Sequence, residues 1–413
     1  MNPRLIWAAL VLVALAALVS LGWLLGAARP AGPHASDAVA AAGWTLADGS
    51  LAAVADPPGD EAVAAAPGPI AAPQPDAALG PDCGFAPWLE RPGTLPTDAE
   101  KARIHRQVAA GWLASLQASP DMALQAVGRW LGSTTFNIHE PALADCRGEG
   151  CRPVLQRLVR RVERLSGQRA QAAQSLQTQA LASSDPRVLA LAAASCHFQA
   201  PTELGDCLAG PAARWVALEP DNAAAWLQQA QAAHLQGDWS GEADAIHHAS
   251  LATRYQPPGT WVGALLDRQL PAELQGEPRV VLQIAVAGAV ATLSNVSPSV
   301  VDHCRQTAVE DPNRAQTCLR LAELLLAQAP DLITLAYAEA LGRHAGWSEE
   351  RQNAQRAQRE ALMAAQQREA QADLGQDGGD SGPSCRQLLR GGAMLQRVAR
   401  LGELRAMREL AQR

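Results

Sequence analysis

The stretch that decides the fold is Glu219 to Tyr255, with the sequence EPDNAAAWLQQAQAAHLQGDWSGEADAIHHASLATRY. It predicts two antiparallel helices. Pro220, Asp221 and Asn222 form a start signal for the first helix, because Asn or Asp can cap the free backbone N–H groups of a helix start, and the helix runs to Leu235. Gly237-Asp238 interrupts the run, and a second helix follows from about Ser240. The many alanines allow the two backbones to pack closely.

This stretch resembles a tetratricopeptide repeat, a helical hairpin that recurs about every 34 residues. The residues that carry the resemblance are Pro220, Trp226, Gly237, Asp238, Trp239 and Ala243. The chain departs from the family pattern at Ala230 and Ala233, where the family prefers Gly and Tyr, at the extra residue in the turn (Ser240-Gly241), and at the late closing Pro257. The resemblance implies stacked hairpins with a concave surface that binds proteins or peptides. The alternative is an unrelated Ala-rich helical bundle.

Similar signals occur throughout residues 185–345. Asp185-Pro186 and Pro220 both mark helix starts, and the two prolines lie 34 residues apart (220 − 186). Asp311-Pro312-Asn313 marks another boundary between helices. We therefore expect an all-α fold with TPR-like helical hairpins over this region. The charge-free stretch 280–301 is too short in its apolar part for a second transmembrane helix, so we expect a buried core helix there.

The N-terminus predicts a membrane anchor. Residues 5–28 carry no charge, and as a helix they are roughly 36 Å long, enough to cross a bilayer. A cleaved signal peptide usually has a shorter apolar region. Residues 1–4 are then a short cytoplasmic tail, and residues 29–82, rich in Ala, Pro and Gly, are a disordered linker. The expected location is the inner membrane, single-pass, with the body in the periplasm.

The rest of the chain divides by composition. Residues 83–184 are expected to form an N-terminal helical region, residues 346–374 a polar, solvated helix, and residues 375–383 a flexible break. Residues 384–413 form an amphipathic helix with several arginines on its polar face. We expect it to pack against the array as a capping helix; the alternative is that it lies on an acidic membrane surface.

The eight cysteines favour disulfides, because an even number in an exported protein is typical of a disulfide framework. Cys304 and Cys318 lie at similar distances from Asp311-Pro312-Asn313, so they should face each other across a hairpin, within reach of a bridge. Cys196 and Cys207 flank a similar turn. The remaining candidate pairs are Cys146 with Cys151 and Cys83 with Cys385.

A metal site is the competing use of these residues. Cys146 and Cys151, with His139 nearby, are spaced more loosely than the ligands of zinc motifs. The sequence therefore predicts no metal ligand.

The histidines form no recognisable motif. His247 and His248 are adjacent on a helix, so they point about 100° apart and make a poor chelate. We expect them to be exposed polar positions. His303 stands beside a cysteine, and we interpret it as incidental to the bridge.

The composition excludes several functions. The net charge is −7, which gives no general footprint for nucleic acid. No Walker loop, dinucleotide fingerprint or nucleophile elbow occurs, so the sequence predicts no catalytic residue and no cofactor. Two catalytic carboxylates that are distant in the sequence and close in the folded protein remain an alternative.

We expect a protein that mediates protein–protein interaction or scaffolding in the bacterial envelope, with unknown envelope proteins as partners and with the inner membrane held through residues 5–28. Exposed Trp or Arg residues of the repeat region should carry the binding. The alternatives are an all-α periplasmic enzyme, which needs two carboxylates about 5–10 Å apart in a cleft, and a ligand-binding accessory with a closed apolar pocket.

Overall fold

The structure is a computed structural model, and it describes residues 82–89, 95–134, 160, 167, 170–197, 201–293, 297–305, 311–374 and 384–412. The predicted anchor at 5–28, almost all of the predicted linker, Cys146, Cys151 and the predicted break at 375–383 lie outside these residues. Among the helices that the structure describes, none is both long and apolar enough to span a membrane.

Within the described residues the fold is all-α, as predicted, and no strand occurs there. In chain order the helices are η1 (Ala86–Trp88), α2 (Asp98–Gln117), α3 (Met122–Ser133), α5 (Pro186–Cys196), α6 (Pro201–Leu218), α7 (Ala223–Leu235), α8 (Trp239–Leu251), α9 (Gly259–Arg268), α10 (Gly276–Ala291), α11 (Pro298–Arg305), α12 (Pro312–Gln328), α13 (Leu332–His344), α14 (Glu349–Leu374), α15 (Cys385–Leu401) and α16 (Glu403–Ala411). Residues 170–182 are helical as well.

Short polar side chains set many of the helix starts. Thr97 and Glu100 form the two reciprocal hydrogen bonds of a capping box at the start of α2. Asp185 accepts from the Arg187 backbone N–H at the start of α5, and Asn222 caps α7 in the same way. These caps satisfy backbone donors that the helix itself leaves free. The starts therefore fall where Asp, Asn and Thr precede a helical run.

The deciding stretch forms the hairpin of α7 and α8. Gly237 has a φ of +75°, a left-handed conformation that glycine adopts without a steric penalty, and it ends α7. Asp238 caps α8, so the second helix begins at Trp239, one residue before the predicted Ser240. Trp226 of α7 reaches α8 and stacks on the ring of His248, with 4.5 Å between the ring centroids.

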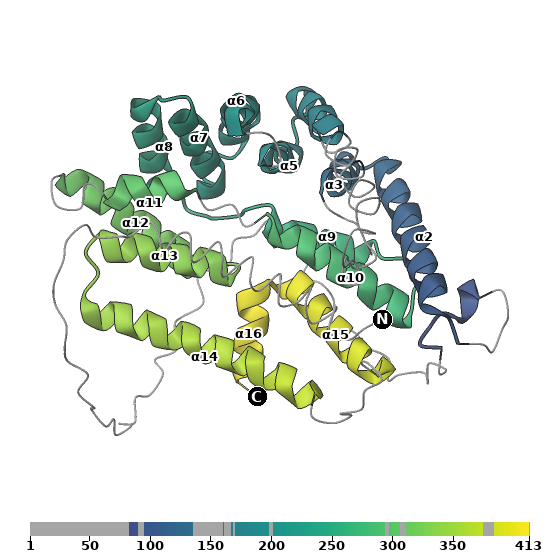
Figure 1. Ribbon diagram of the computed structural model, residues 1–413. Helices are drawn as coiled ribbons and strands as arrows, with labels where there is room; N and C mark the ends of the chain where they lie inside the picture. The colour runs from purple at the N-terminus through teal and green to yellow at the C-terminus, as the bar shows by residue number, and fades with distance from the viewer. Residues whose placement is uncertain are drawn as a thin grey trace, which may run out of the picture.

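The first half of the body is an arc in which each helix packs on the next. α2 packs on α3, α3 on α5, α5 on α6, α6 on α7 and α7 on α8 (Figure 1). The chain then continues into α9 and α10, which Figure 1 shows beneath the arc. α12 packs on α8 and extends the series to α13 and α14.

The inner side of the arc is partly covered by the chain itself. Val262 and Leu266 of α9 and Leu282 of α10 belong to the same buried apolar cluster as Leu189 of α5 and Trp130 of α3. Across the same contact, the indole N–H of Trp112 donates to the backbone carbonyl of Gln269 at 2.8 Å. Residues 280–291 are thus part of a core helix, as expected.

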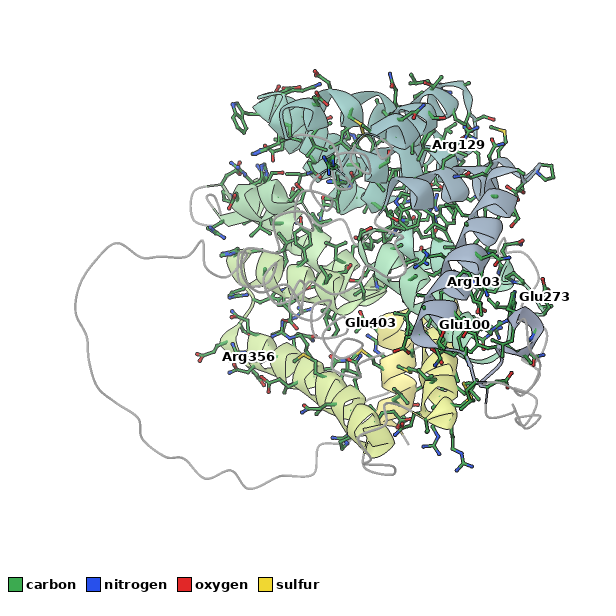
Figure 2. The ribbon with its side chains drawn as sticks, turned by 45° about the vertical axis from the view of Figure 1, so that its right-hand side comes forward. Glu100, Arg103, Arg129, Glu273, Arg356 and Glu403 are labelled. Atoms are coloured by element: carbon green, nitrogen blue, oxygen red, sulfur yellow. A yellow bond between two sulfur atoms is a disulfide. The ribbon has the colours of Figure 1, made fainter. Side chains whose placement is uncertain are left out.

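The C-terminal region differs from its prediction in one respect. The single helix expected over 384–413 is two helices, because Gly402, with a φ of +81°, separates α15 from α16. The turn is held by the Leu404 N–H, which donates to the carbonyl of Pro330, and by Glu403, which accepts from the Leu332 N–H at 3.0 Å (Figure 2). α15 packs on α9 and α10.

The long polar helix α14 packs on α13 and α16 and exposes most of its length. Leu362 of α14 joins a small buried cluster with Leu335, Leu404 and Met407, while Arg356 extends from its exposed side (Figure 2). The solvated helix predicted over 346–374 therefore has one narrow packed stripe.

Candidate functional site: a polar cavity between α8, α11 and α12

A cavity of about 690 Å³ lies between the N-terminal half of α8 and the facing parts of α11 and α12. Polar and charged side chains line most of it, and three of them are histidines: His234, His247 and His303. We call it the histidine cavity. Its volume is in the range of small-molecule and peptide sites, about 300–1,000 Å³.

The α7–α8 turn places an exposed aromatic ring at this cavity. The Asp238 carboxylate accepts from the Gly241 N–H at 2.9 Å, and this hydrogen bond holds the pKa of Asp238 below its ordinary value. Trp239, the first residue of α8, lines the cavity with 64% of its surface exposed. The same turn therefore caps the helix and presents a large apolar side chain to solvent.

The opposite wall is held by a disulfide. Cys304 of α11 is joined to Cys318 of α12, with their Cα atoms 5.8 Å apart. His303 and Thr317 directly precede these cysteines, and both line the cavity. Asp311 caps α12 by accepting from two backbone N–H groups, so α12 starts at a fixed place on this wall.

His303 and Arg314 form the polar centre of this wall. The Arg314 Nε donates to His303 Nε2 at 3.0 Å, and its terminal nitrogen lies 3.2 Å from His303 Nδ1. Burial, and after it the positive charge of Arg314, lowers the pKa of His303 to about 4. At neutral pH His303 is therefore uncharged and Arg314 is already engaged.

On the α8 side, Glu242 is a buried carboxylate with an incomplete shell of partners. Its Oε2 lies 3.1 Å from His234 Nδ1, and the residue is 4% exposed. Its Oε1 has no hydrogen-bond partner among the described residues. The ring of His234 also contacts the edge or face of Trp239, with 5.2 Å between the centroids at an angle of 81°. Glu242, His234 and Trp239 thus form one connected group.

The two adjacent histidines of α8 take different roles. His247 is exposed, as predicted, and its Nδ1 lies 3.5 Å from Thr317 Oγ1 across the cavity. His248, which was also predicted to be exposed, is half-buried, because its ring stacks on Trp226; Asp244 lies within 3.5 Å. The pair does not form a chelate.

The residues of the predicted repeat signature separate into two groups. Trp239 and Ala243 line the histidine cavity, next to the turn that Gly237 and Asp238 form. Trp226 lies at the start of α7, where its indole N–H donates to the carbonyl of Pro220 at 2.8 Å. Trp226 therefore helps to hold the start of the hairpin, whereas Trp239 and Ala243 form part of the cavity wall.

Three cysteine pairs lie at disulfide distance, and they are pairs that the sequence predicts: Cys83 with Cys385, Cys196 with Cys207, and Cys304 with Cys318. Cys83–Cys385 ties the start of the described body to the start of α15, 302 residues later. The fourth predicted pair, Cys146 with Cys151, lies outside the described residues.

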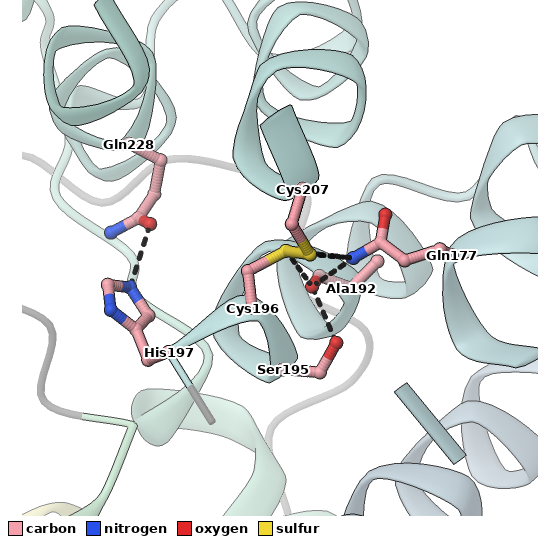
Figure 3. The surroundings of a disulfide bond; sticks show 7 residues. All are labelled: Gln177, Ala192, Ser195, Cys196, His197, Cys207 and Gln228. Atoms are coloured by element: carbon pink, nitrogen blue, oxygen red, sulfur yellow. Dashed lines mark hydrogen bonds between the residues drawn. A yellow bond between two sulfur atoms is a disulfide. The ribbon is translucent and has the colours of Figure 1, made fainter. Parts of the chain in front are cut away.

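Polar side chains lie beside the Cys196–Cys207 bridge (Figure 3). The Gln177 side-chain amide donates to the Ala192 carbonyl at 2.8 Å and lies 2.9 Å from the sulfur of Cys196. His197, next along the chain, lies 3.3 Å from the Gln228 side chain (Figure 3). Burial lowers the pKa of His197.

The carboxylates at the histidine cavity already hold structural partners. Glu242 contacts His234, Asp302 lies 3.5 Å from Arg305, and Asp311 caps α12. Within the described part of the chain no group of three or more His, Cys, Asp or Glu side chains is arranged to hold a metal ion.

Comparison with known proteins gives no relative: no family model, curated protein or solved structure matches the chain.

Proposed function

We propose that the protein is a membrane-anchored, periplasmic helical-repeat protein that mediates protein–protein interaction or scaffolding in the bacterial envelope. The observation that carries the proposal is Trp239, a tryptophan that is 64% exposed at the edge of the histidine cavity. Tryptophan is enriched among the residues that dominate binding energy at protein interfaces. Exposure of such a ring costs hydrophobic free energy, which binding recovers.

The frame around Trp239 supports this proposal. Its turn is fixed by Gly237 and Asp238, and the opposite wall is fixed by Cys304–Cys318. A rigid site loses little conformational freedom on binding, so more of the contact energy appears as affinity. The resemblance of Glu219–Tyr255 to a tetratricopeptide repeat points to the same class of function.

The compartment and the anchor belong to the same proposal. Three disulfide pairs suit an oxidising environment such as the periplasm. The charge-free residues 5–28 are long enough to serve as the anchor. Both points support a body held in the envelope, where its partners would be other envelope proteins.

The test is site-specific photocrosslinking in living cells that produce the full chain. A benzophenone amino acid replaces Leu235, which is 42% exposed beside the α7–α8 turn; as a matched control it replaces Leu251, which is 52% exposed at the far end of α8. We expect one reproducible adduct from position 235 and none from position 251. The change Trp239→Ala should lower the yield of that adduct at least about fivefold.

Two outcomes contradict the proposal. Equal adducts from positions 235 and 251 would indicate nonspecific contact, and an unchanged adduct in the Trp239→Ala variant would remove the carrying observation. A folded, abundant protein with no adduct at either position would favour the enzyme or ligand-binding alternatives.

A further inference from the structure

We infer that the histidine cavity binds a basic side chain, Lys or Arg, on an extended segment of the partner protein. This inference rests on the proposed function and names the chemistry that the partner brings to it.

The charges around the cavity favour a cation over an anion. Three carboxylates line it, those of Glu242, Asp302 and Asp311, against the single guanidinium of Arg314. The Arg314 Nε donates to His303 Nε2, and the low pKa of His303 keeps that ring uncharged at neutral pH. Asp302 lies 3.5 Å from Arg305 and Asp311 caps α12, so the carboxylate of Glu242 is the negative charge of this lining that is left for an entering group to compensate.

Glu242 supplies the specific acceptor. A carboxylate removed from water is costly unless an opposite charge and hydrogen bonds compensate it. Among the described residues, the hydrogen-bond partner of the Glu242 carboxylate is His234, which carries a charge only when protonated, and Oε1 has none. An ammonium or guanidinium group in the cavity would compensate the negative charge of Glu242.

Trp239 supplies the second half of the recognition. A cation over a tryptophan ring is attracted by the negative face of the ring. This attraction contributes about 0.5 kcal/mol at an exposed site and about 2 kcal/mol at a desolvated one. His234 contacts Trp239 and Glu242 at once, so the aromatic ring and the carboxylate belong to the same local group. A flexible alkyl stem with a charged end, as in Lys or Arg, matches this pairing of apolar and acidic groups.

The size of the cavity favours a segment over a single small ion. A volume of about 690 Å³ is several times that of one Lys side chain. Other polar side chains of the lining, among them Asn313 and Thr317, can form hydrogen bonds with the backbone of an extended peptide.

The test measures binding of a defined basic peptide to the full chain in a nonionic detergent. The probe is a fluorescein-labelled hexapeptide with alternating Lys and Ala. Fluorescence anisotropy at low salt measures its binding. Glu242→Gln and Trp239→Ala should each weaken its binding at least tenfold. Glu360→Gln, a matched charge removal at an exposed site on α14, should change binding less than about twofold.

Two comparisons keep the result interpretable. Trp239 is exposed, so Trp239→Ala tests the site even if Glu242→Gln lowers stability in a thermal melt monitored by circular dichroism. The same peptide with acetylated lysines keeps its length and loses its charge, and it should not bind. Absence of binding by the Lys peptide, equal binding to all variants, or equal binding of the acetylated peptide would each overturn the inference.

A free amine is the other source of the same chemistry. 1,5-Diaminopentane should displace the peptide only at a concentration at least about a hundredfold above that of the peptide; tighter binding of the diamine would overturn the assignment to a protein segment. The crosslinking experiment separates the two proposals. A Trp239-dependent adduct together with failure of the Lys peptide would leave the proposed function standing and remove only this inference.

Discussion

Two helical hairpins of this chain are closed by a short disulfide beside a histidine, and they do different things. In α5–α6, Cys196 and Cys207 pack with Ala193, Leu208 and Ala232 in a closed cluster, and His197 turns to a buried neighbour on α7. In α11–α12, both cysteines of the bridge are buried, whereas Cys207 of the first bridge is partly buried, but the neighbouring His303 lines an open cavity. The disulfide of α5–α6 therefore stabilises the core, whereas the disulfide of α11–α12 holds a wall of the site.

The difference comes from what packs against each hairpin. α5 and α6 have helices on both sides, α3 and α7, so the residues beside the bridge are covered. α12 packs on α8, and Ile246 of α8 and Leu321 of α12 belong to one buried apolar cluster, while polar residues of the two helices line the cavity beside it. A bridge beside such a contact positions side chains for binding rather than for packing.

The largest expected effect separates stability from binding. The double changes Cys196→Ala/Cys207→Ala and Cys304→Ala/Cys318→Ala each release a loop of similar length, with sequence separations of 11 and 14. Loop-closure entropy predicts a loss of about 3 kcal/mol of unfolding free energy for each. Urea unfolding measures this loss.

Binding should distinguish the two variants although their stabilities do not. Only Cys304→Ala/Cys318→Ala should lose affinity for the Lys peptide, by at least tenfold under conditions where both variants are folded. Similar affinity losses in both variants would show that the α11–α12 bridge has no special relation to the cavity.

The next effect concerns pH. The pKa of His303 is lowered to about 4, and that of His197 is lowered too, so the unfolded chain takes up these protons before the folded one does. Their contribution to stability is therefore complete above a pH of about 6.5 and is lost as the pH falls toward 4. The urea midpoint should fall over this range, and His303→Gln and His197→Gln should each reduce the fall.

Arg314 sharpens this comparison. Its charge contributes to the lowered pKa of His303, whereas burial is the only cause that lowers the pKa of His197. The change Arg314→Gln should therefore raise the pKa of His303 and leave that of His197 in place. Titration of carbon-labelled histidine by NMR measures both, and an equal shift of the two rings would contradict the assignment.

The sequence predicts the helices far better than the cavity, and the reason is the range of the contacts. Asp185, Asn222 and Asp311 act on backbone groups two or three residues away, so their caps can be inferred from local spacing. The Cys304–Cys318 pairing follows from distance to a turn. These are local signals, and the structure agrees with them.

The cavity depends on contacts that no local pattern specifies. His247 and Thr317 lie 70 residues apart in the sequence, and α9, α10 and α11 stand between α8 and α12 along the chain. The one usable signal was His303 beside Cys304, since a residue next to a bridge is held in place, but the sequence alone favoured an incidental role. Gly402 was also missed, because an amphipathic pattern continues on both sides of the break between α15 and α16.

A smaller effect is expected at the start of α12. Asp311→Ala removes a cap that accepts from the Asn313 and Arg314 N–H groups, and such a loss costs about 1 kcal/mol. Asp185→Ala at the start of α5 is the matched change on the other hairpin and should cost a similar amount. Only the change at Asp311 should also weaken the Lys peptide, because Arg314 stands in the first turn that this cap fixes.

The smallest expected effect tests whether the cavity is held closed by its own polar contacts. The 3.5 Å separation between His247 Nδ1 and Thr317 Oγ1 is at the long limit of a hydrogen bond, and His247 is exposed. Thr317→Val keeps the shape of the side chain and removes the hydroxyl, so the unfolding free energy should change by less than about 0.5 kcal/mol. A loss above about 1 kcal/mol would mean that the packing of α8 on α12 depends on this contact. The two helices would then be held together at the site itself, and the site would not be an open cavity.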